Sequence, residues 1–260
     1  MKKFDPGLGV RIDKDQMEFR YDQDVFGPQP EKRTLSDIRG SLKDPDCKGP
    51  DIVYSIAMDV GKKKHQKQLY QRKLLFGVVT YAAGALGEEP IRSQGHIHKA
   101  SSHSGWSPPE IYEIWEGKAV IYMQEYADDF PGKCYAVQAG PGDVVVVPPG
   151  WAHATISADP AAPLTFGAWC DREYGFEYGK IRAHQGLAWY PILDDNFNIV
   201  WEHNDNYIYT NLIEKSPNKY ENLDIIERVP IYKQFENNPD TFQFVSKPFL
   251  KRNAWENFVP

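Results

Sequence analysis

The sequence is poor in cysteine, in long apolar runs and in positive charge, and each shortage excludes a class of protein. Its three cysteines, Cys47, Cys134 and Cys170, are odd in number and widely spaced, which excludes a disulfide framework and a CxxC metal site. No stretch reaches the roughly 18 apolar residues of a membrane span. Residues 1–16 lack the apolar core of a signal peptide. We therefore expect a cytoplasmic protein with no membrane partner.

The charge balance argues against a nucleic-acid partner. Acidic residues outnumber basic ones, 36 to 30. A nucleic-acid-binding protein typically presents a broad basic face, whereas the one dense basic run here is 61–67, which we interpret as a solvated hairpin tip. The composition therefore favours a small-molecule ligand.

Short segments rich in β-branched and aromatic residues recur between glycines and prolines. Many short strands separated by turn residues are typical of an all-β sandwich or barrel. We see no internal repeat and no helical run in residues 50–180 that competes with this interpretation. The predicted strands lie within 51–60, 74–81, 111–122, 134–139, 143–148, 152–157 and 164–169.

Both ends of the chain depart from the strand pattern. A segment from Thr34 to Leu42 begins with a capping residue and predicts one short helix. The last residues carry too many aromatic side chains for disorder, and 223–228 predicts another short helix. We expect an N-terminal extension at 1–50, a barrel at 51–205, and a C-terminal extension at 206–260 that packs on the barrel or on a partner subunit.

The pattern that carries chemistry begins with His96 and His98. Side chains at i and i+2 of a strand point to the same face, so the two imidazoles can share a metal ion. Such a pair alone is often accidental. Here it is followed by Glu110 and Gly117, and then by a block that runs from Gly142 to His153.

These blocks resemble the paired signatures of the cupin superfamily, G-x5-H-x-H-x(3,4)-E-x6-G and G-x5-P-x-G-x2-H-x3-N. Ser157 replaces the final asparagine, and eleven residues separate His98 from Glu110, more than the signature has. Residues 99–109 are rich in Ser, Gly and Pro, so a loop between two strands can absorb the insertion. The resemblance implies an all-β fold, the cupin double-stranded β-helix or jelly-roll barrel, with short helices at the N- and C-terminal ends.

The predicted metal ligands are His96, His98, Glu110 and His153. Three imidazoles and one carboxylate suit one divalent transition metal, with positions left open for a substrate. The residues alone do not choose among Fe²⁺, Mn²⁺, Ni²⁺ and Zn²⁺, and we expect Fe²⁺ first.

Strand parity favours Glu110 over Glu113, because Glu110 and Tyr112 share one strand face and Glu113 and Trp115 the other. His103 lies in the insertion, and we interpret it as a solvated loop histidine. The remaining histidines, His65, His184 and His203, receive the same interpretation.

Within the cupins, the chain most resembles the cupin-type glucose-6-phosphate isomerases, known mainly from archaea. The hallmark of that family is similar to Ser93-x-Gly95-His96-x-His98 followed by Glu110-x-Tyr112, with Ser replacing Thr. The similarity spans about residues 30–205. It includes the segments 33–39, 147–153 and 174–181.

This resemblance implies a homodimeric aldose–ketose isomerase that interconverts glucose 6-phosphate and fructose 6-phosphate, a step of glycolysis and gluconeogenesis. Tyr54, Ser93 and Gly95 would contact the phosphate, since hydroxyl and N–H groups donate to phosphate oxygens. Tyr178 is a further candidate for the substrate pocket. Phe176 stands where the family has a substrate-contacting histidine, and Cys170 where it has a tyrosine.

The chemistry requires a proton or a hydride to move between C1 and C2 of the sugar. Glu110 is the candidate base beside the metal, and Tyr112 is a candidate hydrogen-bond donor to the substrate. Alternatives are an isomerase of another sugar, such as mannose 6-phosphate or an unphosphorylated aldose, a cupin dioxygenase that uses Fe²⁺, and a non-catalytic sugar-binding cupin.

Overall fold

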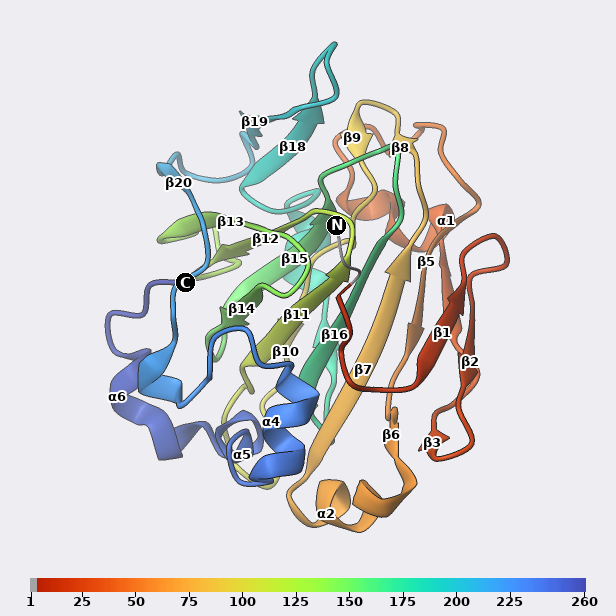
Figure 1. Cartoon of the computed structure of the whole chain (residues 1–260). Coiled ribbons are helices and arrows are strands. Elements are labelled where there is room, and N and C mark those ends of the chain that lie inside the picture. The colour runs from red at the N-terminus through yellow and green to blue at the C-terminus, as the bar shows by residue number, and fades with distance from the viewer. Residues whose placement is uncertain (1–3) are drawn as a thin grey trace.

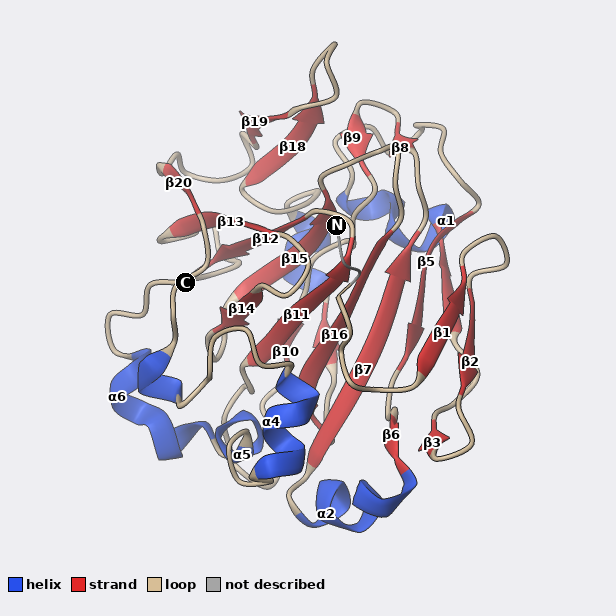
Figure 2. Cartoon of the chain, viewed as in Figure 1, coloured by secondary structure: helices blue, strands red, loops and turns tan. Residues whose placement is uncertain are grey.

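Two β-sheets face each other and form a barrel of the jelly-roll type in the computed structural model, which describes residues 4–260 (Figures 1 and 2). The larger sheet has six strands in the order β14-β11-β16-β7-β5-β4, and the smaller has four in the order β15-β12-β13-β20. Neighbouring strands are antiparallel except β13 and β20, which are parallel. The predicted all-β jelly roll is confirmed.

The strands of the six-stranded sheet, in chain order, are β4 (Glu31–Thr34), β5 (Ile52–Ala57), β7 (Leu74–Tyr81), β11 (Glu110–Glu116), β14 (Val144–Val147) and β16 (Leu164–Asp171). Those of the four-stranded sheet are β12 (Ala119–Gln124), β13 (Cys134–Ala139), β15 (Ala152–Ser157) and β20 (Leu212–Lys215). The remaining strands form two-stranded pairs: β1 (Val10–Asp13) with β2 (Glu18–Tyr21), β3 (Val25–Phe26) with β6 (Gly61–Lys62), β8 (Ala85–Leu86) with β9 (Glu89–Pro90), β10 (Ile97–His98) with β17 (Phe176–Glu177), and β18 (Trp189–Leu193) with β19 (Ile199–His203).

The segment predicted as one strand at 111–122 is two strands, β11 and β12, joined by a turn at Gly117. That residue has φ +83°, and a Cβ there would lie 2.6 Å from the carbonyl oxygen of Pro163. Only glycine fits a left-handed position with backbone so close. The turn sends the chain from the larger sheet to the smaller one.

The helices are short and lie outside the two sheets (Figure 2). The predicted N-terminal helix is α1 (Leu35–Ile38), where the Asp37 carboxylate accepts a 2.8 Å hydrogen bond from the backbone N–H of Thr34. A 3₁₀ turn, 39–41, continues it. The other helices are α2 (Gln66–Gln71), α3 (Gly179–Ala183), α4 (Ile231–Asn237), α5 (Gln243–Ser246) and α6 (Arg252–Trp255).

The interpretation of the lysine-rich run as a solvated hairpin tip is wrong. After β6 the run forms a 3₁₀ turn at 63–65 and then α2. Leu69 is fully buried and His65 is 8% exposed, while Lys63 and Lys64 remain in solvent. Burial of His65 and Leu69, four residues apart, makes one face of a helical turn apolar. His65 is therefore not a solvated loop histidine either.

The helix predicted at 223–228 is also wrong. Only a 3₁₀ turn, 221–223, forms there, and Asp224 ends it with a left-handed φ of +58°. The helices of this region follow later in the chain, at α4 to α6.

The C-terminal segment, defined as residues 216–260, covers the outer face of the six-stranded sheet (Figure 1, blue). Tyr232 and Phe242 stack on Trp169 of β16, with ring centroids 5.6 and 5.5 Å away. Phe76 of β7 meets the Tyr232 ring edge-on at 5.3 Å. The aromatic residues of this segment thus pack on the barrel of their own chain. Across residues 4–260, no helix is long and apolar enough to span a bilayer.

Glu113 of β11 anchors this segment. Its Oε1 accepts a 2.8 Å hydrogen bond from the backbone N–H of Ile231, where α4 begins, and its Oε2 accepts one of 2.9 Å from Trp115 Nε1. Among the described residues, no basic side chain forms an ion pair with Glu113. Burial raises the pKa of Glu113 to about 7, because two hydrogen bonds compensate only part of the lost hydration.

This anchor predicts a pH-dependent stability. Between pH about 4.5 and 7 the folded chain holds the Glu113 proton and the unfolded chain does not, so the free energy of unfolding decreases as pH rises through this window. The total change is about 3 kcal/mol. In urea titrations, Glu113→Gln should lack this decrease. Glu116→Gln, a half-exposed position at the end of the same strand, should keep it, and identical pH profiles for Glu113→Gln and the native chain would contradict the prediction.

Candidate active site

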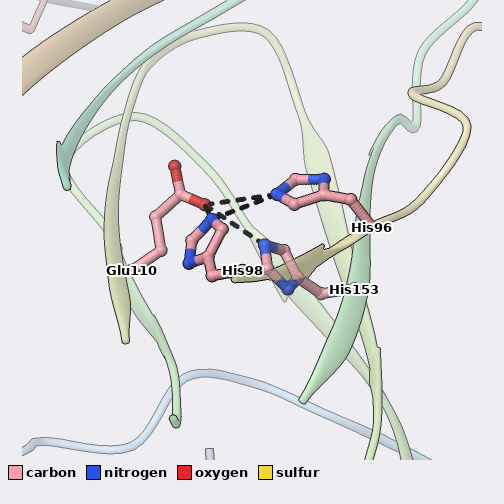
Figure 3. Close-up of side chains that lie close together, drawn as sticks. All are labelled: His96, His98, Glu110 and His153. Atoms are coloured by element: carbon pink, nitrogen blue, oxygen red, sulfur yellow. Dashed lines mark hydrogen bonds and ion pairs between the residues drawn. The ribbon is translucent and has the colours of Figure 1, made fainter. Parts of the chain in front are cut away.

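Four side chains from three segments of the chain meet inside the barrel (Figure 3). His98 lies in β10 with His96 just before it, Glu110 begins β11, and His153 lies in β15. Their ligand atoms all lie within 4.8 Å of one another. Glu110 Oε2 is 3.1 Å from His153 Nε2, 3.2 Å from His98 Nε2 and 3.9 Å from His96 Nε2. The sequence prediction selected these four residues.

The backbone holds the histidines at these distances. His96 and His153 exchange two backbone hydrogen bonds of 3.0 Å, which join the β10 segment to β15. Glu110 is placed by β11, which pairs with β14 on one side and β16 on the other. The cluster thus rests on regular strands, which fix side chains better than loops do.

Two backbone carbonyls orient the imidazoles. The Nδ1 atoms of His98 and His153 lie 3.0 Å from the carbonyl oxygens of Pro108 and Trp151. A carbonyl only accepts, so both Nδ1 atoms carry protons, and both Nε2 atoms point toward Glu110, where each can share a proton with the carboxylate or offer its lone pair to a metal ion. This is the outer-shell arrangement of metal-ligating histidines.

The electrostatics favour a cation at the centre of the cluster. Burial would raise the pKa of Glu110, but hydrogen bonds from His153 and His98 outweigh it and hold the pKa well below the usual range. Burial and the neighbouring imidazoles lower the pKa of His96 well below normal. The Glu110 carboxylate raises the pKa of His98 against the effect of burial. A carboxylate surrounded by imidazole lone pairs is stable only with a proton or a metal ion among them.

The donor set fits a divalent metal. Ligands about 2.1 Å from one ion and at right angles to each other are about 3 Å apart, as given by typical metal–nitrogen bond lengths. The 3.1 Å between the Nε2 atoms of His96 and His98 and the 3.1 and 3.2 Å distances to Glu110 match that spacing. These four residues can hold a metal ion.

A cavity inside the barrel opens onto this cluster, and it is apolar except for a few groups. Tyr112 Oη donates to Glu110 Oε2 at 2.7 Å, and the Cys170 thiol donates to Oε1 at 3.2 Å. Burial and the nearby carboxylate raise the pKa of Tyr112 and of Cys170 well above normal, so both remain protonated donors. Oε1 therefore faces the cavity, away from the imidazoles (Figure 3).

Three of the four residues expected to contact substrate line this cavity: Tyr54, Ser93 and Tyr178. Gly95 does not. With φ +84°, it lets the chain pass beside Leu187, whose Cδ1 would lie 2.9 Å from a Cβ. Phe176 also lines the cavity and packs on His96 and His98, with ring centroids 4.5 and 5.7 Å away.

Strand parity places the carboxylates of β11 as predicted: Glu110 faces the cavity and Glu113 the outer face. The interpretation of His103 as a solvated loop histidine is wrong, because its ring is largely buried. The main chain is exposed there, yet the side chain is only 19% exposed and is held by Ser101, Asp171, Glu173 and the carbonyl of Ser246.

Sequence reasoning missed Arg33 as a site residue. Among the described residues that line the cavity, it carries the one permanent positive charge. It lies on β4, pairs with Tyr54 in the sheet register, and has the exposed Glu31 as ion-pair partner at 2.9 Å. Its segment, 33–39, belongs to the family resemblance, but a lone arginine gave no signal of its own.

The fold is a jelly-roll barrel, and three histidines and one glutamate converge on its inner face. These features are those of a cupin whose site could hold a metal ion. The chain belongs to the glucose-6-phosphate isomerase family, whose model matches residues 32–210. The chain is 26% identical to glucose-6-phosphate isomerase of Thermococcus litoralis over 178 residues, 66% of this chain and 84% of the relative. It is also 26% identical to that of Pyrococcus horikoshii over 188 residues, 70% of this chain and 87% of the relative.

Solved structures give a weaker likeness. An oxalate oxidase aligns at 17% identity and a TM-score of 0.31, over 40% of this chain and 45% of its own. A mutant of Bacillus subtilis oxalate decarboxylase aligns at 15% identity and a TM-score of 0.34, over 48% and 28%.

The cluster predicts the effect of removing one ligand. His153→Ala should lower metal affinity by more than about 100-fold, the upper range for changes to outer-shell partners. The fold should persist, because the backbone pairing of β15 with β12 does not depend on the imidazole. Metal content after dialysis and the circular dichroism spectrum measure the two effects. His184→Ala serves as the control, because His184 pairs with Asp129 and does not belong to the cluster. The side chains of His184 and His203 are only 15% and 16% exposed, so neither is a solvated loop histidine. Unchanged metal content in His153→Ala would refute the assignment.

Proposed function

We propose that this protein interconverts glucose 6-phosphate and fructose 6-phosphate, as the names of its relatives describe for them. The observation that carries the proposal is the juxtaposition, in one cavity, of the cluster of His96, His98, Glu110 and His153 with Arg33. An isomerase of a sugar phosphate needs both a site for the reacting carbons and a site for the phosphate.

Glu110 is suited to move the proton. Its Oε2 belongs to the ligand cluster. Its Oε1 faces the cavity and accepts from Cys170, and it keeps a second lone pair that can take a proton from C2 and return it to C1. The Tyr112 hydroxyl fixes the carboxylate through Oε2. A bound divalent metal would act as a Lewis acid on the sugar oxygens. We propose Fe²⁺ first, with Mn²⁺, Ni²⁺ or Zn²⁺ as alternatives that the same donors accept.

Arg33, Tyr54 and Ser93 are suited to bind the phosphate. Arginine offers paired N–H donors to phosphate oxygens. Ser93 Oγ accepts from the backbone N–H of Thr155 at 3.1 Å, which leaves its own proton to donate. Burial raises the pKa of Tyr54 well above normal, so its hydroxyl also remains a donor. The Glu31 partner of Arg33 is 65% exposed and is easily exchanged for a substrate anion.

The direct test is turnover of the full chain, stripped with a chelator and reloaded with each of the four metals. Formation of glucose 6-phosphate from fructose 6-phosphate is followed with a coupled dehydrogenase, beside mannose 6-phosphate and unphosphorylated sugars. We expect turnover only after metal addition, and we expect it to be faster with glucose 6-phosphate and fructose 6-phosphate than with the other sugars. Oxygen uptake without isomerisation would instead identify a dioxygenase.

Glu110→Gln tests whether Glu110 acts only as a metal ligand or also as the catalytic base. The amide keeps a coordinating oxygen but cannot accept the proton, so turnover should remain about 100-fold low even with saturating metal. Steady-state rates against metal concentration measure this. Glu177→Gln, an exposed change on β17, should leave turnover intact. Near-normal turnover in metal-saturated Glu110→Gln would favour a hydride shift between C1 and C2.

Arg33→Gln tests the phosphate site. Losing a charged hydrogen bond of about 1.5–3 kcal/mol should raise the KM for the sugar phosphate roughly 10- to 100-fold, with a smaller change in kcat. Lys32→Gln, the adjacent position of β4 whose side chain pairs with Glu18, is the matched control. An unchanged KM in Arg33→Gln would place the phosphate elsewhere in the cavity.

The homodimer also remains a proposal. Support comes from the family resemblance and from Ile208, Tyr209 and Ile213, exposed apolar side chains at and just before the edge strand β20.

A further inference from the structure

We propose that the C-terminal segment positions the metal ligand His98, by holding the inserted loop, residues 99–109, against the barrel. His103 and Arg252 are the positioning residues. The inference rests on the metal centre of the proposed function, and it assigns a role to a part of the chain that lies beyond the residues matched by the family model.

The inserted loop connects two metal ligands directly. It begins next to His98 and ends next to Glu110, so any movement of the loop acts on both. Ser107 Oγ donates to the carbonyl of His98 at 2.7 Å, and the carbonyl of Pro108 accepts from His98 Nδ1 at 3.0 Å. The end of the loop therefore fixes the position, the tautomer and the ring orientation of His98.

The loop is folded on itself, which makes it a unit. The backbone N–H of Ser101 donates to the carbonyl of Trp106 at 2.8 Å, and that of Gly105 donates to the carbonyl of Ser101 at 2.8 Å. Ser101 is 2% exposed. A displacement of the loop backbone near His103 therefore also moves Pro108, because these hydrogen bonds limit independent movement within the loop.

The C-terminal segment contacts the loop at two points. His103 Nε2 lies 2.9 Å from the carbonyl oxygen of Ser246, to which it donates, and the Arg252 guanidinium lies over the Trp106 ring, 5.6 Å from its centroid. Ser246 is fully buried, and its hydroxyl donates to the carbonyl of Arg72 at 2.6 Å. The contact point for His103 is therefore anchored to the barrel.

The rest of the His103 ring is held by Ser101 of the loop itself and by two carboxylates, one at the end of β16 and one just after it. Its Nδ1 lies 2.8 Å from Ser101 Oγ and 3.3 Å from Glu173 Oε2, and its Nε2 lies 3.4 Å from Asp171 Oδ2. Asp171 ends β16 and is fully buried. The ring thus joins the loop, the end of β16 and the C-terminal segment.

The test is Co²⁺ binding by the full-length, metal-free protein, with the ligand-field absorption spectrum as the readout of ligand geometry. His103→Ala and Arg252→Ala should each weaken Co²⁺ binding roughly 10-fold, within the range for outer-shell changes, and should alter the spectrum. His103→Gln should restore both, because its amide N–H can donate to the Ser246 carbonyl. Lys251→Ala is the matched control, since Lys251 pairs with Asp224 and does not touch the loop.

A purely structural role would lower the melting temperature of the metal-free variants and leave Co²⁺ affinity and spectrum unchanged, which would overturn the inference. Arg252 is exposed, so Arg252→Ala tests the second contact of the segment with the loop, at Trp106, if His103→Ala fails to fold. If the native chain binds Co²⁺ and both variants bind it equally well, only this inference fails. If the native chain binds no Co²⁺, the metal centre of the proposed function fails with it.

Discussion

Burial of both faces of the central strands is the constraint on which the rest of this structure depends. Every residue of β7 and β16 is buried, whereas a sheet of a two-sheet barrel usually leaves one face in water. The four-stranded sheet covers the inner face, so the outer face requires a second cover. The aromatic C-terminal segment supplies that cover, with Tyr232 and Phe242 on Trp169. Its contact with the inserted loop, which leads to His98 and Glu110, is a consequence of this requirement.

Most of the barrel could be predicted from local patterns, and the four residues of the candidate metal cluster from the cupin signatures that the chain resembles. Strand segments alternate with turn residues, and His96 and His98 share a face by the period of a strand. Glu110 and Glu113 are three positions apart, so the alternation of side chains along a strand predicts opposite faces for them. The two carboxylates indeed lie on opposite faces of β11. Gly117, at φ +83°, shows why the turn between β11 and β12 had to be glycine, but the sequence did not reveal that a strand ended there.

The parts that sequence reasoning missed depend on contacts between distant residues. Arg33 reaches the cavity only because β4 pairs with β5. His103 looks like a loop residue until Ser246, far along the chain, lies against its ring. Helices as short as α5 and α6 have little stability of their own and form because Phe244 and Ala254 are buried against the barrel. The lysine-rich run is helical for a similar reason, the burial of Leu69.

The two carboxylates of β11 have a consequence for how this chain can vary. One strand presents the candidate metal ligand Glu110 to the interior and the C-terminal anchor Glu113 to the exterior. A one-residue insertion or deletion within the strand would exchange the two faces, so metal binding and attachment of the C-terminal segment would be lost together. Length changes in this part of the chain are therefore confined to the loop before the strand, where eleven residues already separate His98 from Glu110. Natural variants of the chain should differ in the length of that loop while the strand keeps a constant length.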